Sequence, residues 1–148
     1  METLTRRLAR HAVLGLDTSL FIYHFEAHPA YVPLTRSILD GVATGARRGI
    51  ASELVLLELL VKPFRLDRED LADQYEVFLA HFPNLEIRPV GRNVARTAAR
   101  IRANHGFAAP DAIHLANAVE NGATIFVCND KRLRSVKGIE VLILDDYS

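Results

Sequence analysis

The hydrophobic pattern of the chain contains two short runs in which nearly every residue is apolar, residues 12–16 and 124–128. Runs of this kind are typical of strands that are buried on both faces of a parallel sheet. Three further segments, residues 49–51, 85–90 and 140–144, are apolar or alternate between apolar and polar positions. They also predict strands, which makes five in all.

Between the strands, apolar residues recur at helical spacing. Thr18 or Ser19 is expected to cap the first helix, and Ser52 the third. A capping box at residues 67–70 predicts the start of the fourth helix, and Pro63 the end of the third. The segments predicted as helices are residues 20–25, 32–43, 53–61, 67–82, 92–104 and 111–120, with a short turn at 131–134.

Strands that alternate with helices through short connections predict an α/β fold, with a mostly parallel central sheet flanked by helices. The 148 residues show no repeat and no linker, so we expect a single domain, 1–148. Residues 1–11 form an N-terminal extension that fits either a short helical lead-in or a basic arm. Right-handed crossovers place the carboxyl ends of the strands along one edge, where such sheets bind ligands.

Composition narrows the class of protein. The 18 basic and 18 acidic residues balance, so net charge argues neither for nor against a nucleic-acid partner. The single cysteine, Cys128, excludes an internal disulfide and a cysteine zinc cage, and it suits a reducing compartment. No apolar run approaches the roughly 20 residues of a membrane span, and the start of the chain lacks a secretory signal. We therefore expect a cytoplasmic protein without a membrane partner.

Three acids fall at the predicted ligand-binding edge. Asp17 and Asp130 follow the two buried strands, and Asp111 begins the helix that leads into the second of them. Glu58 lies inside a leucine-rich helix, where an unpaired charge is costly. Four converging carboxylates would repel one another and raise one another's pKa, and a divalent cation would remove that penalty. An all-oxygen site favours Mg²⁺ or Mn²⁺ over zinc.

Each acid also has a purely structural explanation. Asp17 and Asp111 suit the start of a helix, Asp130 suits the start of a short helical turn, and Glu58 suits an ion pair at the rim of an amphipathic helix. Independent caps have no reason to share one edge, so the joint placement favours a metal site. Residues 145–146 are acids that also follow a strand, but they lie in the terminal tail, where order is least assured.

Basic residues follow Asp130 directly. Lys131, Arg132 and Arg134 would lie beside the proposed metal site, where they are candidates for contact with a nucleic-acid backbone. The alternative is an ordinary solvated face.

Other polar residues receive structural interpretations. Arg92, Arg96 and Arg100 recur every four residues along one predicted helix face, and we interpret them as a solvated face. His114, three residues after Asp111, is expected to pack or to donate a hydrogen bond rather than to bind zinc. Cys128 is expected to fill a small buried space.

Four segments together resemble the PIN-domain family, and most closely VapC-type toxin ribonucleases. The resemblance runs from about residue 13 to residue 144, with the segments in the family's order and spacing. The eight-residue segment that begins at Asp111 is the most specific of them. The segments are residues 16–19 (LDTS), 52–59 (SELVLLEL), 111–118 (DAIHLANA) and 128–130 (CND).

This resemblance implies a PIN-like three-layer fold and a metal-dependent nuclease whose acids are Asp17, Glu58, Asp111 and Asp130. It implies supporting roles for the two neighbouring polar residues Ser19 and Asn129. It further implies an RNA substrate, a cognate antitoxin and a homodimer. The chain departs from the family in two places: Cys128 stands where relatives usually carry Thr or Ser, and the N-terminal extension is long.

The expected activity is hydrolysis of RNA phosphodiesters by metal-activated water, restrained by an antitoxin. Asp17, Asp111 and Glu58 are expected to hold the metal, and Asp130 to bind a second ion or to orient the water. Excess leucine in residues 56–64 predicts a groove or dimer surface. Two alternatives stay open: a PIN nuclease in RNA processing without an antitoxin, and a non-catalytic regulatory module of the doubly wound type.

Overall fold

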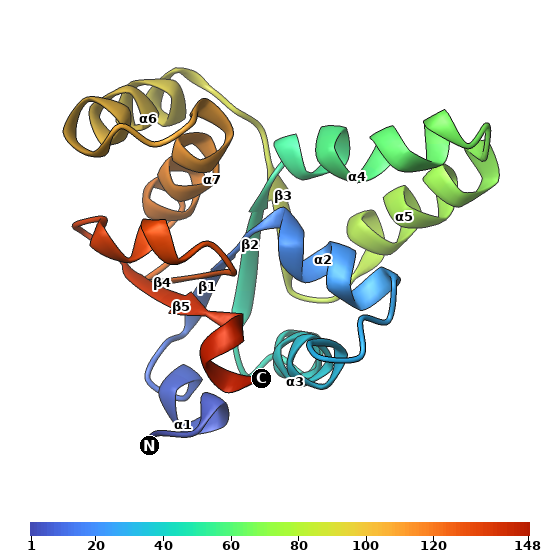
Figure 1. Ribbon diagram of the computed structural model, residues 1–148, viewed down its shortest axis with the longest axis horizontal. Helices are drawn as coiled ribbons and strands as arrows, with labels where there is room; N and C mark the ends of the chain where they lie inside the picture. Colours follow the sequence, from blue (N-terminus) through green and yellow to red (C-terminus); the bar gives the residue numbers. More distant parts are fainter.

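The computed structural model describes all 148 residues and builds them around a five-stranded sheet in the order β3-β2-β1-β4-β5 (Figure 1). Every neighbouring pair of strands is parallel. The five predicted strands are confirmed, each within two residues of its expected ends. They are β1 (Val13–Leu16), β2 (Arg48–Ser52), β3 (Leu85–Arg88), β4 (Ile125–Cys128) and β5 (Glu140–Ile143).

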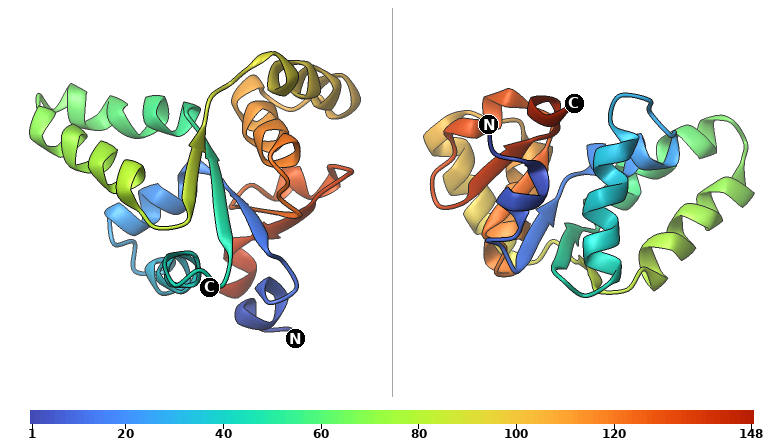
Figure 2. Two further views of the ribbon diagram at one scale, coloured as in Figure 1. Left: turned by 180° about the vertical axis from the view of Figure 1, so that it is seen from behind. Right: turned by 90° about the horizontal axis from the view of Figure 1, so that it is seen from below.

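Helices cover both faces of this sheet, which confirms the predicted α/β architecture. α6 and α7 lie on one face and α2 and α3 on the other, while α4 and α5 form an antiparallel arm beside the sheet (Figures 1 and 2). The helices are α1 (Leu4–Leu8), α2 (Thr18–Phe25), α3 (Val32–Ala43), α4 (Leu54–Arg65), α5 (Glu69–His81), α6 (Arg92–His105), α7 (Ala109–Glu120) and the 3₁₀ helices η1 (Lys131–Ser135) and η2 (Leu144–Tyr147). No helix combines the length and the apolar character needed to cross a bilayer.

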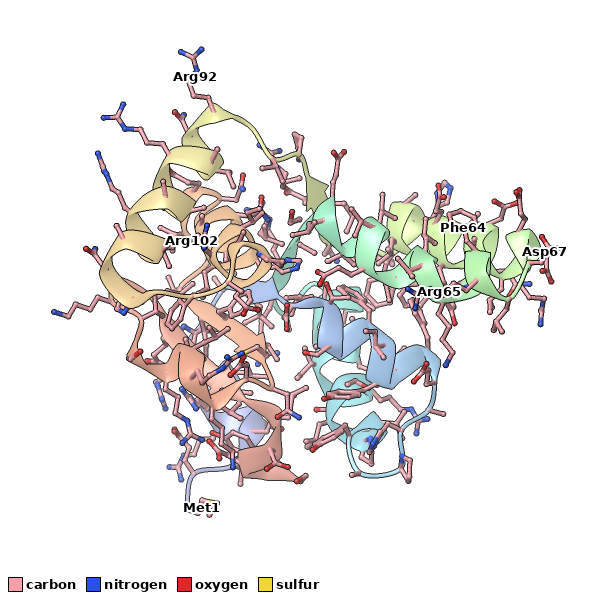
Figure 3. The ribbon with its side chains drawn as sticks, turned by 45° about the horizontal axis from the view of Figure 1, so that its top comes forward. Met1, Phe64, Arg65, Asp67, Arg92 and Arg102 are labelled. Carbon is pink, nitrogen blue, oxygen red and sulfur yellow. The ribbon has the colours of Figure 1, made fainter.

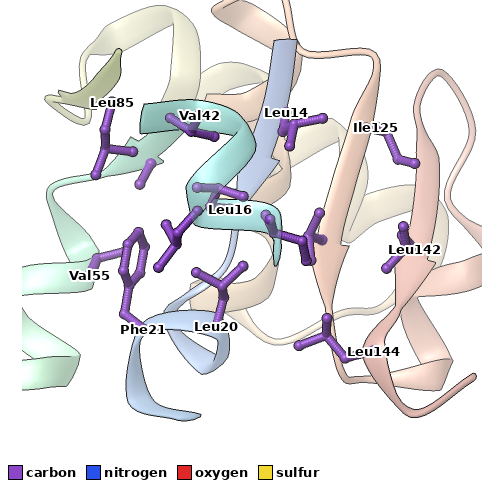
Figure 4. Close-up of a cluster of buried hydrophobic side chains, with 14 of the residues drawn as sticks. Leu14, Leu16, Leu20, Phe21, Val42, Val55, Leu85, Ile125, Leu142 and Leu144 are labelled. Atoms are coloured by element: carbon purple, nitrogen blue, oxygen red, sulfur yellow. The ribbon is translucent and has the colours of Figure 1, made fainter. Parts of the chain in front are cut away.

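The alternation of β1 divides the core into two parts. Leu14 and Leu16 join the larger cluster of buried side chains on the α2 and α3 face (Figure 4). Gly15 faces α7 instead. A Cβ atom at this position would lie 2.5 Å from the Cβ of Ala118, so only glycine lets α7 approach the sheet this closely. β1 and α7, which carry two of the candidate acids, are thereby held against each other.

Several predicted helix ends are wrong for identifiable reasons. α4 continues two residues beyond Pro63, whose buried ring lies in the last turn and interrupts little of the hydrogen-bond ladder. The expected capping box at residues 67–70 is absent. Asp67 adopts a left-handed conformation (φ 55°) in the turn, and α5 begins at Glu69. The N-cap of α4 is Glu53 rather than the expected Ser52, although the Ser52 hydroxyl accepts the Leu54 N–H at 3.1 Å.

The N-terminal extension is a helical lead-in rather than a free basic arm. Leu4 and Leu8 of α1 are buried in the larger core cluster. The Arg7 guanidinium donates hydrogen bonds to the Val141 carbonyl at 3.0 Å and to the Tyr147 hydroxyl at 3.3 Å. These contacts attach α1 to β5 and η2.

Candidate active site

The candidate acids come from four different parts of the fold. Asp17 lies between the end of β1 and the start of α2, and Asp130 follows β4 by two residues. Asp111 lies in the first turn of α7, and Glu58 lies in α4. Because β1 and β4 are parallel neighbours, their carboxyl ends open at the same edge of the sheet.

Asp17 is a largely buried carboxylate, with 18% of its side chain exposed. Asp17 occupies the N-cap position of α2, but its side chain makes no capping hydrogen bond, so capping does not account for the carboxylate. Burial raises its pKa. The nearby His114 opposes that shift most, and a hydrogen bond from the Ser19 hydroxyl to Oδ2 at 3.1 Å also opposes it. Ser19, predicted to support the site, thus contacts Asp17 directly. Ionisation of Asp17 costs free energy at this buried position.

Asp111 experiences the charges of two other acids. Burial raises its pKa, and the negative charges of Asp17 and Asp130 raise it further. The buried thiol of Cys128 experiences the same three carboxylates: burial is the main cause that raises its pKa to about 12, and Asp17, Asp130 and Asp111 add to the shift. Asp17, Asp111 and Asp130 therefore lie close enough to repel one another.

Glu58 is held by two hydrogen bonds rather than left as an unpaired charge. Its Oε1 accepts the Nε2–H of His114 at 2.5 Å and the hydroxyl of Thr18 at 2.8 Å. The hydrogen bond from His114 is the main reason that the pKa of Glu58 lies below its usual value. The same His114 nitrogen lies 3.8 Å from Oδ1 of Asp17, so one imidazole links two of the candidate acids.

His114 is buried, and its Nδ1 has no hydrogen-bond partner. A carboxylate only accepts hydrogen bonds, so the proton lies on Nε2 in the contact with Glu58. The predicted hydrogen-bonding role of His114 is confirmed.

Thr18 is the functional residue that sequence reasoning missed. It was expected to cap α2, but its hydroxyl points to Glu58 instead. The available signal was a polar residue directly after Asp17 at the end of a buried strand, and the structure buries Thr18 almost completely.

Asp130 also starts the short helix η1, as its structural explanation predicted. Its Oδ1 accepts the backbone N–H of Arg132 at 3.0 Å. The Arg132 guanidinium donates to both carboxylate oxygens, at 2.6 Å from Nη2 and 3.0 Å from Nε. These hydrogen bonds lower the pKa of Asp130.

Asn129 braces the same loop. Its amide donates to the Tyr23 hydroxyl at 3.1 Å, and its carbonyl accepts the backbone N–H of Asp145 at 2.8 Å. These contacts tie the loop after β4 to α2 and to the C-terminal segment.

All three basic residues after Asp130 are engaged with acids. Arg132 pairs with Asp130 itself. Lys131 pairs with Asp145 at 3.4 Å, and Arg134 pairs with Asp146. The two acids of residues 145–146 are thereby explained as ion-pair partners.

The donor set fits a hard divalent cation. No three His, Cys, Asp or Glu side chains come close enough together to bind one metal ion jointly. Mg²⁺ typically binds through one or two carboxylates and keeps several waters, so the repelling pair of Asp17 and Asp111 is the natural place for it. A cation there would offset the repulsion that raises the pKa of Asp111.

Comparison with known proteins gives one family and one fold. The sequence profile of the PIN domain matches residues 15–139. No curated protein sequence matches the chain.

The fold resembles chains of three solved structures. One is a toxin–antitoxin complex from Klebsiella pneumoniae (TM-score 0.69, 17% identity, 89% of this chain and 97% of that chain). The second is VapBC2 from Rickettsia felis bound to a DNA fragment from their promoter (TM-score 0.70, 18% identity, 88% and 98%). The third is DNA-bound VapBC from Salmonella typhimurium (TM-score 0.68, 19% identity, 89% and 97%).

Proposed function

Because the chain belongs to the PIN domain family, we propose that it is a metal-dependent endoribonuclease and the toxin of a toxin–antitoxin pair. The observation that carries the proposal is the electrostatic conflict among Asp17, Asp111 and Asp130, three acids far apart in sequence that meet at one edge of the sheet. A fold gains nothing in stability from such a conflict, which is typical of sites that bind a cation.

We assign the residues of the site as follows. Asp17 and Asp111 would hold Mg²⁺ or Mn²⁺, which would supply charge neutralisation and an activated water. His114 and Thr18 fix the orientation of Glu58, so that its second oxygen stays available to a metal-bound water. Asp130 would bind a second ion or orient the attacking water, and for this it must exchange its contact with Arg132.

RNA contact by Lys131, Arg132 and Arg134 remains part of the proposal. Each of these residues would leave an ion pair to contact a phosphate, which reduces the net gain.

The partner proposal rests on the arm of the molecule. Leu57, Val61, Phe64 and Leu66 are large apolar residues that are exposed on α4 and at its end, and Figure 3 shows Phe64 on this arm. Leu60, expected to contribute to this surface, is buried instead. The similar structures are toxin–antitoxin complexes, so we propose that the arm contributes to contacts with a cytoplasmic antitoxin or with a second copy of this chain.

Cleavage of defined RNAs tests the proposal. We expect cleavage with Mg²⁺ or Mn²⁺ and none with a chelator, with mapped ends that give the bond broken. Asp17→Asn and Asp111→Asn should lower the rate at least about 100-fold. Asp146→Asn is the matched control, an acid that also follows a strand but lies outside the site. It releases Arg134 from its ion pair and should not lower the rate. Cleavage that survives chelation would overturn the mechanism.

A further inference from the structure

The positive charge of the chain is concentrated in one segment. Residues 87–110 contain five arginines and no acid. The remaining 124 residues therefore carry 13 of the 18 basic residues and all 18 acids, a net charge of −5 that the segment balances. An otherwise acidic molecule thus has one strongly basic region, most of which is α6.

Three of these arginines form a row on α6. Arg92, Arg96 and Arg100, here called the α6 arginine row, are spaced by four residues, so their Cα atoms follow one another at about 6 Å along the helix axis. All three are exposed. Val94 and Ala98, on the opposite side of α6, are buried against Ala112 and Ala116 of α7, which fixes the row on the solvent side (Figure 1).

No residue of the α6 arginine row makes an ion pair. This distinguishes the row from Lys131, Arg132 and Arg134, each of which is paired with an acid. Figure 3 shows Arg92 extending from the start of α6 into solvent. The row can bind an anion without first losing a partner.

The helix that carries the row leads towards the site at one end. At its start, Arg92 lines an open cleft of about 350 Å³ together with Arg88, the last residue of β3, and Glu120 at the end of α7. At its other end, Arg102 donates a hydrogen bond to the Phe107 carbonyl at 2.9 Å, in the loop that leads to Asp111. A strand of nucleic acid that follows α6 would therefore reach the edge where the acids lie.

We propose that the α6 arginine row binds the phosphate backbone of single-stranded RNA on the outer face of α6, outside the acidic site, and that the RNA reaches the site past the end of this helix. The identification of the polyanion as RNA rests on the proposed function. The row offers evenly spaced guanidinium groups without ion-pair partners, a pattern suited to contact with phosphates irrespective of base sequence. A protein interface would have an apolar centre, and four of the seven large exposed apolar residues lie on α4 or at its end instead.

Binding of a short labelled single-stranded RNA, measured with a chelator present so that the RNA stays intact, tests this role. Replacing Arg92, Arg96 and Arg100 by Gln should weaken binding about tenfold or more at low salt. It should also reduce the slope of log affinity against log salt by about 2, at roughly 0.7 for each lost contact with a single strand. Replacing the same three residues by Lys should retain most of the slope.

The matched control removes three other exposed arginines that make no ion pair, Arg6, Arg36 and Arg65, again by substitution with Gln. The net charge changes equally, but we expect less than about a threefold loss. Circular dichroism and thermal melting of both triple variants verify that they fold, and Arg96→Gln alone should show a smaller loss of the same kind.

Four results would overturn the proposal: unchanged RNA binding in the row variant, an equal loss in the control variant, stronger competition by duplex DNA than by RNA, or a change in oligomeric state without a change in RNA affinity. Cleavage assays with Mn²⁺ separate this proposal from the enzymatic one. If the unaltered chain cleaves RNA and the row variant binds RNA normally, only the proposed role of the α6 arginine row is refuted. A chain that binds RNA through the row but never cleaves it refutes the nuclease.

Discussion

Asp17 and Glu58 lie near the same imidazole, that of His114, but their pKa values shift in opposite directions. His114 donates to Glu58 and lowers its pKa. It also opposes the rise in the pKa of Asp17 from 3.8 Å away, but burial outweighs this effect. The ionised form of Glu58 is therefore favoured in the folded protein, whereas the ionised form of Asp17 is disfavoured. The two residues make opposite contributions to stability at neutral pH.

Asp17→Asn should stabilise the protein while it abolishes activity. Because the pKa of Asp17 is raised in the folded state, the ionised carboxylate disfavours folding above that pKa. At low pH Asp17 is protonated in both the folded and the unfolded state, so the difference vanishes. The free energy of unfolding should rise by roughly 0.5–2 kcal/mol at pH 7. The gain should shrink as the pH falls through the raised pKa towards 3.8, the usual value of the group.

Urea unfolding at several pH values measures this effect. Asp146→Asn, whose carboxylate is exposed and paired with Arg134, serves as the control and should not stabilise the protein. A destabilised Asp17→Asn variant would show that Asp17 has a structural role.

His114→Leu should lower the free energy of unfolding, in contrast to Asp17→Asn. It removes the main hydrogen bond to Glu58 and costs about 1 kcal/mol, a low value for a bond to a charged group because a third of the Glu58 side chain is exposed. The pKa of Glu58 should rise towards its usual value, so that the acid limb of the pH–rate profile moves to higher pH. Thr18→Val, which removes the second hydrogen bond, should shift that limb less. An unchanged limb in His114→Leu would contradict a positioning role.

Elements were predicted well where the hydrophobic pattern is continuous and poorly where a polar side chain has two possible partners. The strands β1 and β4 follow from uninterrupted apolar runs. Thr18 and Asp67 both suit helix caps by residue type. Thr18 binds Glu58, 40 residues away, and Asp67 adopts the left-handed turn between α4 and α5. Such competition is decided by tertiary contacts that local sequence does not contain.

Gly15→Ala tests the contact between β1 and α7. The added Cβ would meet Ala118 at 2.5 Å and Phe126 at 3.0 Å, so the helix must move away from the sheet. We expect a loss of roughly 1–3 kcal/mol in denaturant unfolding. Activity should fall further than stability explains, because Asp17 directly follows β1 and Asp111 lies on α7, and these two elements separate.

Gly41→Ala is the matched control for this substitution. Its Cβ would meet only the Arg47 side chain, whose Nη1 lies at 2.7 Å and can shift without moving the backbone, although its Nε donates to the Leu8 carbonyl. Gly41 lies within α3, where alanine favours the helix. This variant should be neutral or more stable by up to about 1 kcal/mol. A similar loss in both variants would show that the contact between Gly15 and Ala118 is not the cause.

At the scale of the whole molecule, topology was the strongest predictor. Parallel strands with right-handed crossovers bring strand ends to one edge, which placed Asp17, Asp111 and Asp130 together before any contact was known. The topology could not predict that Arg132 binds Asp130 or that His114 binds Glu58. Those contacts depend on side-chain packing between residues that the sheet order alone does not bring into register.

A cation at this edge should stabilise the entire fold. At a concentration of Mn²⁺ one hundred times its dissociation constant, binding adds about 2.7 kcal/mol. For a chain of this size that raises the melting temperature by about 5–10 °C. Asp111→Asn should lose most of the shift, whereas Asp146→Asn should keep it. An equal shift in Asp111→Asn would place the cation elsewhere.

Cys128 gives this protein a built-in reporter of its own opening. The thiol is fully buried at the end of β4, and its pKa of about 12 leaves almost no thiolate at neutral pH. An alkylating reagent can therefore modify the native chain only through transient exposure of this strand. Since the chain contains no second thiol, the rate of modification follows fluctuations at a single position, beside the three acids, without any label being introduced.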